Sequence, residues 1–378
     1  MKAIVNGKII LENAVIDNKV LVFGEKILGL ESYAPADAQV IDAKGMYVSP
    51  GLVDIHIHGC YGADVMDGVK DALLTISRGV AKTGVTSFLP TTMTYDWAVT
   101  QKALENVGEN MGSIENGATI LGSHLEGPFI SAEYAGAQPK EYIVPPSFEM
   151  IKDYTNIIKL LTYAPEMDEN NEFTKQIRRQ TNITLSMGHT GATYEQGVAA
   201  YNNGVGNVTH TFNGMRGLTH REPGAAGAAL TQPFFCELIA DNIHVSPYLY
   251  EFLLKNKGAD RLILITDSIA GGGMGDGTFA LGGQPVTVKN GTARLANGAL
   301  AGSVLSLNTA LKNFKEHTNI SLPALFGLAS ANPAKSIGVF SKGSLAIGKD
   351  ADIAIFNENF ECEMTICEGR IVWEKSVI

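Results

Sequence analysis

Short apolar runs alternate with segments of helical composition through the middle of this chain. Parallel strands that are buried on both faces have continuous apolar sequences, and each needs a crossover, usually a helix, to return the chain. The pattern therefore predicts a series of β/α units. The eight apolar runs cover residues 52–57, 85–89, 120–125, 157–163, 183–187, 206–209, 234–239 and 261–265, and the helical segments include 72–82, 96–110, 175–181 and 194–202.

Eight such units correspond to a (β/α)8 TIM barrel, the α/β fold that we expect here. The alternative is a doubly wound open sheet with fewer strands, if one or two of the runs belong together. A length of 378 residues suits one large barrel with an accessory domain.

Both ends of the chain have a different pattern, in which short strand-like segments are separated by turn residues. Segments 8–11, 19–23 and 38–41 have this character near the N-terminus, as do 352–356 and 370–373 near the C-terminus. We therefore expect the two ends to meet in one small β-sandwich. The predicted division is 1–49 and 341–378 for the two parts of the sandwich, and 50–340 for the barrel.

Composition and charge narrow the classes of partner. The net charge is −10, which argues against a nucleic-acid surface because such surfaces are basic. A small anionic substrate remains compatible, since a metal ion and a few cationic side chains reverse the field locally. We expect no membrane span and no signal peptide, because no apolar segment has the required length or position. The four cysteines form no paired framework, so we expect reduced thiols and a cytoplasmic protein.

The first candidate chemistry lies at the end of the first apolar run, where one residue separates His56 from His58. Alternate residues of a strand share a face, so both imidazoles point the same way and can hold one transition-metal ion. A single His-x-His pair also occurs by coincidence. Four further residues, each at the end of a separate apolar run, favour a metal site: Glu126, His189, His210 and Asp267.

In a TIM barrel these six residues meet at one site, because functional groups lie at the C-terminal ends of the strands. A divalent ion held by histidines and carboxylates lowers the pKa of a bound water from ~16 to ~7. A neighbouring carboxylate can accept the water's proton and later donate it to a leaving group. Asp267 is the candidate for this role, because it stands alone on its strand end and small residues follow it. The predicted reaction is metal-assisted hydrolysis of a C–N bond.

Longer motifs around these residues resemble those of the amidohydrolase superfamily and, within it, of the N-acetylglucosamine-6-phosphate deacetylases. The His-x-His pair and the Gly-Lys-Asp-Ala-Asp segment at 348–352 are general to the superfamily, whereas His-Leu-Glu-Gly-Pro-Phe and Arg-Glu-Pro-Gly are more specific to the deacetylases. The resemblance extends over nearly the whole chain. The matching segments are residues 50–59, 124–129, 188–190, 209–215, 221–224, 239–244 and 265–267.

The resemblance implies hydrolysis of N-acetyl-D-glucosamine 6-phosphate to D-glucosamine 6-phosphate and acetate, with a divalent metal ion as cofactor. Glu126, His189 and His210 would hold the principal ion. Asp267 would be the general base and then the general acid. Because the His-x-His pair is present and strand 4 ends without a lysine, a second ion bridged through Glu126 is plausible. The sequence leaves open whether one or two ions bind, and whether the metal is Zn, Fe, Mn, Co or Ni.

The same resemblance implies a pocket for a phosphorylated amino sugar. Asn213 and the backbone N–H of Gly214 would contact the sugar phosphate, and Arg221 would reach the neighbouring site across a homodimer interface. His244 would bind the sugar and the acetamide carbonyl. Gln138 would contact the substrate where other members carry histidine, and glutamine can donate a hydrogen bond there but cannot carry a charge. The other pocket residues would be Ala137, Leu300, Ala301 and Gly302.

Two other functions stay open at this point. One is another amidohydrolase activity, such as that of a cyclic amidase or a deaminase, against which the missing strand-4 lysine and the Arg221 and Asn213 set argue. The other is a sugar-phosphate sensor without catalysis, against which the complete set of metal ligands and Asp267 argues.

Overall fold

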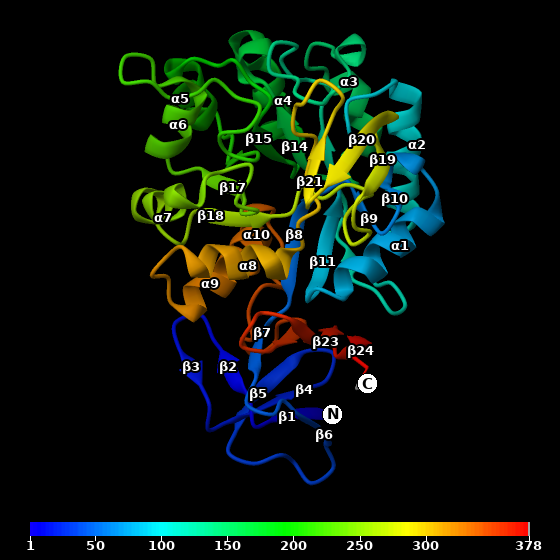
Figure 1. The fold of residues 1–378 in the computed structure, drawn as a ribbon, viewed down its shortest axis with the longest axis vertical. Helices are drawn as coiled ribbons and strands as arrows, with labels where there is room; N and C mark the ends of the chain where they lie inside the picture. The colour runs from blue at the N-terminus through cyan, green and yellow to red at the C-terminus, as the bar shows by residue number, and fades with distance from the viewer. Residues whose placement is uncertain (377–378) are drawn as a thin grey trace.

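The structure is a computed structural model that describes residues 1–376, and parallel strands surrounded by helices form its larger part (Figure 1). Each of the eight apolar runs forms strand, and the third run is divided in two. A six-stranded sheet has the order β13-β14-β15-β16-β17-β18, and a three-stranded sheet has the order β12-β11-β8. The bounds are β8 Leu52–Ile57, β11 Val85–Pro90, β12 Thr119–Ile120, β13 Ser123–Glu126, β14 Ile158–Tyr163, β15 Thr184–Met187, β16 Asn207–Val208, β17 Phe235–Ile239 and β18 Leu262–Ile265.

Parallel bridges join these two sheets on both sides. Ile57, at the end of β8, pairs with Ser268 beyond β18, and Thr91, beyond β11, pairs with His124 on β13. The backbone N–H of Asp267 also donates to the carbonyl oxygen of His56 at 2.9 Å. These contacts bring the ends of the first and last strands together, although 212 residues separate Asp54 from its hydrogen-bond partner Thr266.

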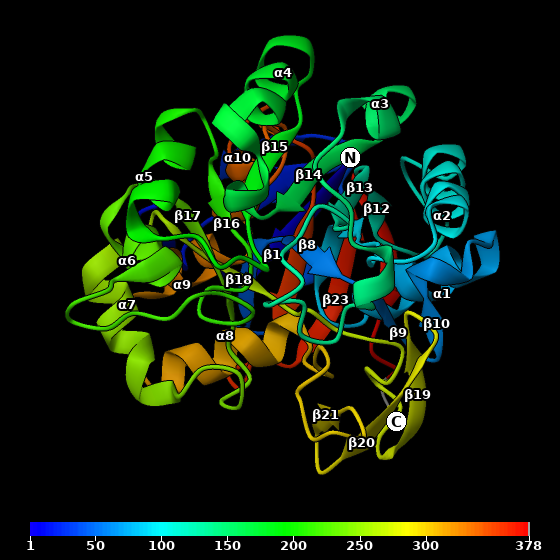
Figure 2. The same ribbon diagram turned by 90° about the horizontal axis from the view of Figure 1, so that it is seen from above.

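The helices lie outside the strands, and seen from above α1, α2, α4, α5 and α6 surround them (Figure 2). Helix α1 buries Leu73, Ile76 and Val80, the spacing of one helix face. Helix α5 begins at a capping box of Thr193 and Gln196. The bounds are α1 Lys70–Ala81, α2 Trp97–Glu109, α3 Phe148–Ile151, α4 Glu172–Gln180, α5 Tyr194–Asn202, α6 Gly224–Thr231, α7 Tyr250–Lys257, α8 Leu307–Glu316, α9 Leu322–Leu328 and α10 Ala331–Ser336, with short 3-10 helices η1 Val65–Asp67, η2 Lys140–Tyr142, η3 Lys152–Tyr154, η4 Pro165–Met167, η5 Glu169–Asn171 and η6 Pro247–Leu249.

Strands from the two ends of the chain lie together on one side of the barrel (Figure 1). One sheet has the order β5-β4-β1-β6, and a second combines C-terminal and N-terminal strands in the order β24-β23-β22-β7-β2-β3. Ile4 and Leu21 of the first sheet share a buried apolar cluster with Ile9 and Ile353 of the second. The bounds are β1 Lys2–Val5, β2 Lys8–Ile10, β3 Val15–Ile16, β4 Val20–Phe23, β5 Ile27–Glu31, β6 Gln39–Asp42, β7 Tyr47–Pro50, β22 Ile353–Phe356, β23 Cys362–Cys367 and β24 Arg370–Glu374.

A small antiparallel sheet lies on the side of the barrel opposite the terminal sheets (Figure 1). Its apolar face carries Leu281, Val286 and Val288, which pack with Met93 and Ala301. The sheet therefore covers part of the barrel mouth. Its strands are β19 Gly277–Leu281, β20 Gln284–Lys289 and β21 Thr292–Arg294, and a two-stranded ribbon nearby consists of β9 Gly59–Cys60 and β10 Ala63–Asp64.

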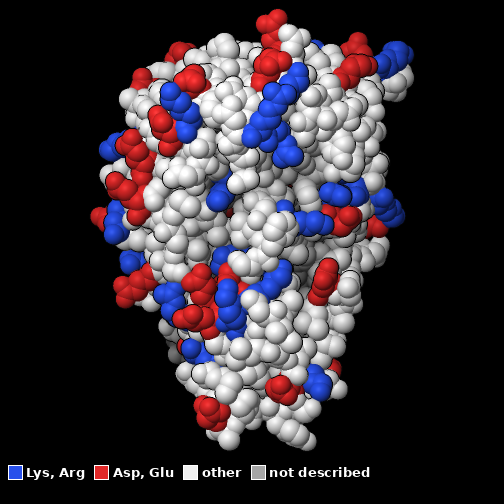
Figure 3. Space-filling view, turned by 180° about the vertical axis from the view of Figure 1, so that it is seen from behind, with Lys and Arg blue, Asp and Glu red and all other residues white. Residues whose placement is uncertain are grey.

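Three features concern the expected partners and surroundings of the protein: the charges on its surface, the length of its apolar helices and the state of its thiols. On the face shown in Figure 3, acidic and basic side chains are interspersed. Within residues 1–376, none of the helices is both long enough and apolar enough to span a membrane. All four cysteine thiols are free and buried.

Candidate metal centre and substrate pocket

The ends of the barrel strands surround a cavity of about 160 Å³. Most of the site residues expected from the sequence line it, although their strands are far apart in the chain. Met93, Gly136 and Leu281 also line it, and the sequence analysis missed them. The expected residues in its wall are His58, Glu126, Ala137, Gln138, His189, His210, Asn213, Gly214, His244, Asp267, Leu300 and Gly302.

Glu126 is the centre of this site, because its carboxylate faces four histidines. Oxygen Oε1 lies 3.1 Å from His210 Nε2 and 3.3 Å from His189 Nε2, and the two nitrogens are 3.1 Å apart. Ligands held at about 2.0–2.1 Å around a tetrahedral ion lie roughly 3.3–3.4 Å from one another. The spacing of these three atoms therefore fits the ligands of one metal ion.

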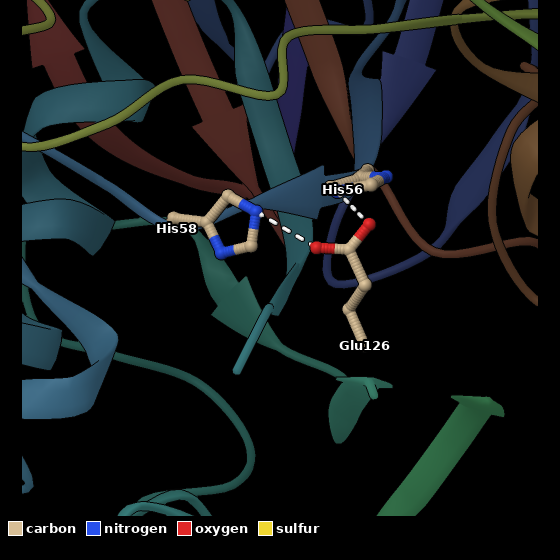
Figure 4. A group of neighbouring side chains, drawn as sticks. All are labelled: His56, His58 and Glu126. Carbon is tan, nitrogen blue, oxygen red and sulfur yellow. Dashed lines mark ion pairs between the residues drawn. The ribbon is translucent and has the colours of Figure 1, made fainter. Parts of the chain in front are cut away.

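The His-x-His pair approaches the same carboxylate from β8, as Figure 4 shows. His58 Nε2 lies 3.3 Å from Glu126 Oε2, and His56 Nε2 lies 3.5 Å from Oε1. Asp267 Oδ1 is 3.2 Å from His58 Nε2 and 3.5 Å from His56 Nε2. Glu126 thus stands between two groups of ligands, one with His189 and His210 and one with His56 and His58.

Each of the four imidazoles is oriented by a contact of its Nδ1 atom, so that its Nε2 atom points toward the Glu126 carboxylate. Backbone carbonyls face Nδ1 in three of them: Thr91 O at 3.2 Å from His58, Tyr134 O at 2.8 Å from His189 and Asn213 O at 3.1 Å from His210. His56 Nδ1 instead faces the Glu237 carboxylate at 3.1 Å. A histidine that donates through one nitrogen presents the lone pair of the other to a metal.

One buried atom shows directly that the residues fit a cation. His56 Nε2 is buried and has no hydrogen-bond partner in the described part of the chain. An unsatisfied buried polar atom costs about 1–3 kcal/mol, and a metal ion beside Glu126 and Asp267 would satisfy it.

Charges within the site hold the two carboxylates ionised. Burial raises the pKa of Asp267, but the neighbouring His56 and His58 outweigh burial and lower that pKa to about 2. Burial likewise favours neutral Glu126, whereas His56, His189 and His210 hold the pKa of Glu126 well below its usual range. For His58, burial lowers the pKa, but Asp267 and Glu126 raise it to about 9. At neutral pH both carboxylates are therefore negative, and a metal ion that binds His58 would displace the proton of this imidazole.

Three of the site residues occupy a strained backbone conformation just beyond their strands. His189, His210 and Asp267 have φ values of 46°, 26° and 49°, in the left-handed region that L-residues with side chains rarely adopt. Such conformations cost about 1–3 kcal/mol each and persist only where the surroundings enforce them. Here the turn directs each side chain into the barrel mouth.

Two expected substrate residues differ in their placement from the others. Arg221 is exposed and donates to His220 at 2.9 Å, outside the cavity wall. Ala301 is fully buried in the apolar cluster beneath β19–β21, and its N–H donates to Ala293 O at 3.2 Å. Within one subunit, neither side chain reaches the cavity.

Gln138 lies in the cavity wall, but both ends of its amide are already engaged. Its Nε2 donates to Glu126 Oε2 at 2.8 Å, and its Oε1 accepts from the backbone N–H of Thr94 at 2.6 Å. Gln138 therefore orients the Glu126 carboxylate through this hydrogen bond.

His244 is also oriented by a neighbour. Its Nδ1 lies 2.7 Å from Asp241 Oδ2, which leaves Nε2 for a ligand. Burial lowers the pKa of His244, but the hydrogen bond to Asp241 outweighs burial and raises it. His244 is thus prepared to donate a hydrogen bond into the cavity.

A search of protein families matches residues 47–372 to the Amidohydrolase family. This match covers most of the chain. The chain belongs to the amidohydrolase family. The resemblance inferred from its motifs is confirmed, and the strands and helices described above are those of a TIM-barrel superfamily.

Several known proteins that are similar to this chain are deacetylases of phosphorylated amino sugars. The N-acetylglucosamine-6-phosphate deacetylase of Bacillus subtilis (strain 168) is 42% identical over 352 residues, which are 91% of this chain and 87% of the relative. The solved deacetylase from Pasteurella multocida is 30% identical, with a TM-score of 0.92 over 98% of this chain and 99% of its own. A mutant of the Mycobacterium smegmatis enzyme in complex with N-acetyl-D-glucosamine-6-phosphate is 25% identical, with a TM-score of 0.91 over 98% and 99% of the two chains.

One residue of this amidohydrolase site that the sequence analysis missed is Glu237, on β17. It is fully buried, and it contacts the ring of His56 and the backbone N–H of His210. The available signal was a single acidic residue inside an otherwise apolar strand, because a buried carboxylate needs a partner.

Replacing Gly214 by alanine is expected to lower the turnover of this amidohydrolase by about 100-fold, the cost of a displacement near 1 Å at a catalytic centre. Gly214 has a φ of +56°, and a Cβ there would lie 2.9 Å from His189 Nδ1 and 3.2 Å from its Cε1. The ring would have to shift, which disturbs both its Nδ1 contact with Tyr134 O and the placement of its Nε2 beside Glu126. Steady-state kinetics on purified Gly214→Ala measures the effect.

Gly291→Ala is the matched control for Gly214→Ala, because Gly291 has a φ of +74° but no heavy atom within 4 Å of the place that a Cβ would take. It introduces the same backbone strain without pressing on a histidine. We expect its kcat to equal that of the unaltered protein. Equal activity of both variants would contradict the role given to the Gly214 and His189 contact.

Proposed function

We propose that this protein hydrolyses N-acetyl-D-glucosamine 6-phosphate to D-glucosamine 6-phosphate and acetate in a metal-dependent reaction. One observation carries the proposal: the Glu126 carboxylate is shared by two pairs of buried histidines, with Asp267 beside it. Clustered histidine and carboxylate ligands of this kind suit hydrolysis assisted by a divalent ion. The kinship with deacetylases of this sugar phosphate supports the choice of substrate.

Each subunit would bind one or two divalent ions. Glu126, His189 and His210 would hold the principal ion, and His56 and His58, with Glu126 and Asp267, would hold a second. A bound ion supplies an activated water and polarises the acetamide carbonyl. Zn, Fe, Mn, Co and Ni all accept such donors, and their availability in the cell decides among them.

Asp267 would transfer the proton. Its carboxylate is ionised at neutral pH, so it accepts a proton from the water whose oxygen bonds to the carbonyl carbon. Asp267 then returns that proton to the amide nitrogen as the C–N bond breaks. The products are the amine and acetic acid, which releases the second proton of the water to become acetate, and Asp267 is again a carboxylate.

The sugar phosphate would lie in the cavity whose wall also contains Asp267. His244, oriented by Asp241, would donate to the acetamide carbonyl or the sugar. Asn213 and the N–H of Gly214 would contact the phosphate. Ala137 and the backbone of Leu300 and Gly302, which line the cavity, would complete the wall.

Arg221 would enter the site of a second copy in a homodimer. A guanidinium matches phosphate oxygens, and the Arg221 side chain is exposed. Exposed large apolar side chains that form a patch are typical of an interface. Those near Arg221 and on the segment up to α7 are Leu218, Ile243, Tyr248, Leu249 and Phe252.

We also propose the domain division and the location of the protein. Residues 1–49 and 341–378, of which 377 and 378 lie outside the described residues, would form one small β-sandwich beside the barrel of residues 50–340. The apolar cluster shared by the two terminal sheets supports this division. The four free, buried thiols are consistent with a reducing cytoplasm.

The test of the proposed substrate compares N-acetylglucosamine 6-phosphate with N-acetylglucosamine. Free-amine release should be efficient with the phosphorylated sugar and at least about 10-fold less efficient in kcat/KM without the phosphate, since one charge-assisted hydrogen bond contributes about 1.5–3 kcal/mol. Equal efficiency for both sugars would contradict a phosphate-binding pocket.

A further inference from the structure

Glu237 is a fully buried carboxylate that touches ligands of both expected metal positions. Its Oε2 lies 3.1 Å from His56 Nδ1 and accepts from the backbone N–H of His210 at 3.2 Å. Its Oε1 has no hydrogen-bond partner among the described residues. Burying a carboxylate in an apolar strand costs free energy of folding. The contacts with His56 and His210 offset part of that cost.

The partner of His56 differs in charge from those of the other three histidines. His58, His189 and His210 each face a neutral backbone carbonyl through Nδ1, whereas His56 faces the Glu237 carboxylate. A carboxylate partner fixes the tautomer of a ligand histidine and raises its basicity as a ligand. In His56 this directs Nε2, which has no other hydrogen-bond partner within residues 1–376, toward Glu126 and Asp267.

We propose that Glu237 is a positioning residue that makes the His56 and His58 pair a working second metal position. It holds the proton on His56 Nδ1, so that Nε2 presents its lone pair where Glu126 Oε1 and Asp267 Oδ1 each lie 3.5 Å away. Its second contact ties the strained turn at His210 to β17. The inference rests on the proposed metal dependence, and it concerns only the second ion.

The test is a Zn²⁺ titration of the full-length, metal-free protein, which gives a dissociation constant for each ion. Glu237→Gln keeps an acceptor but removes the charge, and Glu237→Leu removes both. Loss of a hydrogen-bond partner behind a metal ligand typically weakens affinity 10–100-fold. We expect a weakening in that range for the second ion, larger in Glu237→Leu. The first dissociation constant should change less than about threefold in Glu237→Gln, whose amide oxygen can still accept from the backbone N–H of His210.

Asp168→Asn is the matched control, because it removes a buried carboxylate at the start of α4. The Asp168 carboxylate accepts hydrogen bonds from Phe173 N and Thr174 N, each at 2.9 Å. Among the described residues, no histidine forms a hydrogen bond or ion pair with it. Both dissociation constants should stay unchanged in this variant. If Glu237→Leu fails to fold, the near-isosteric Glu237→Gln decides the question.

Two results would overturn the inference. One is that the Glu237 variants bind both ions as tightly as the unaltered protein. The other is that the unaltered protein binds a single ion while hydrolysing the sugar phosphate, which leaves the proposed function intact and removes the second position. Failure of the unaltered protein to bind any ion would instead overturn the proposed function, and Glu237 with it.

Discussion

Asp267→Asn is expected to lower kcat for deacetylation by about 10³-fold or more while the protein still binds the sugar phosphate. Asparagine keeps the shape of the side chain but cannot accept a proton from the attacking water or return it to the amide nitrogen, and a single general acid–base contributes about 10²–10⁴-fold. The kcat from free-amine release and the dissociation constant of glucosamine 6-phosphate from calorimetry separate these two effects.

Metal content must be measured in the same Asp267→Asn sample, because Asp267 Oδ1 lies 3.2 Å from His58 Nε2. Asp276→Asn is the matched control. The carboxylate of Asp276 accepts from Asn290 N at 2.9 Å in the exposed hairpin, so its variant should have normal kcat. Activity of Asp267→Asn within about tenfold of the unaltered protein would contradict the proton-transfer role.

Glu126→Gln is expected to release both metal ions, because one carboxylate serves both ligand groups. Its Oε1 is within 3.5 Å of His56, His189 and His210, and its Oε2 is 3.3 Å from His58. A neutral amide removes the negative charge, and its NH₂ group would point a donor at one of the two groups. Metal analysis of the dialysed protein should find a large loss from both positions, and turnover should fall with it.

His56→Ala is the informative comparison for Glu126→Gln, because His56 belongs to one ligand group only. It should lose the second ion and keep the first. If Glu126→Gln retained the metal content of the unaltered protein, the bridging role of Glu126 would be wrong.

The sequence predicted that the candidate ligands lie together because regular rules connect their positions to the fold. Alternation along a strand places His56 and His58 on one face, and a barrel brings strand ends together. The cavity accordingly contains Glu126, His189 and His210 as expected. Those rules do not say which side chains contact one another. The contact of Glu237 with His56 and the hydrogen bond from Gln138 to Glu126 therefore became visible only in the structure.

The structure differs from the sequence-based expectations at two further places, the third apolar run and Arg221. The third apolar run is broken at Gly122, which has a φ of +142° and where a Cβ would lie 2.5 Å from the carbonyl oxygen of Ile157. A glycine within a strand often marks such a close backbone approach. Arg221 lies outside the cavity of its own chain, and the proposed role in the site of a second copy would leave no signal in the packing of one subunit.

The most direct test of metal-dependent deacetylation is free-amine release from N-acetylglucosamine 6-phosphate by the purified protein, before chelation, after chelation and after metal is added back. We predict turnover that is lost with the metal and restored by a divalent ion such as Zn, Fe, Mn, Co or Ni. Turnover that persists after complete removal of metal, or no turnover with any of these ions, would contradict metal-dependent deacetylation at Glu126 and Asp267.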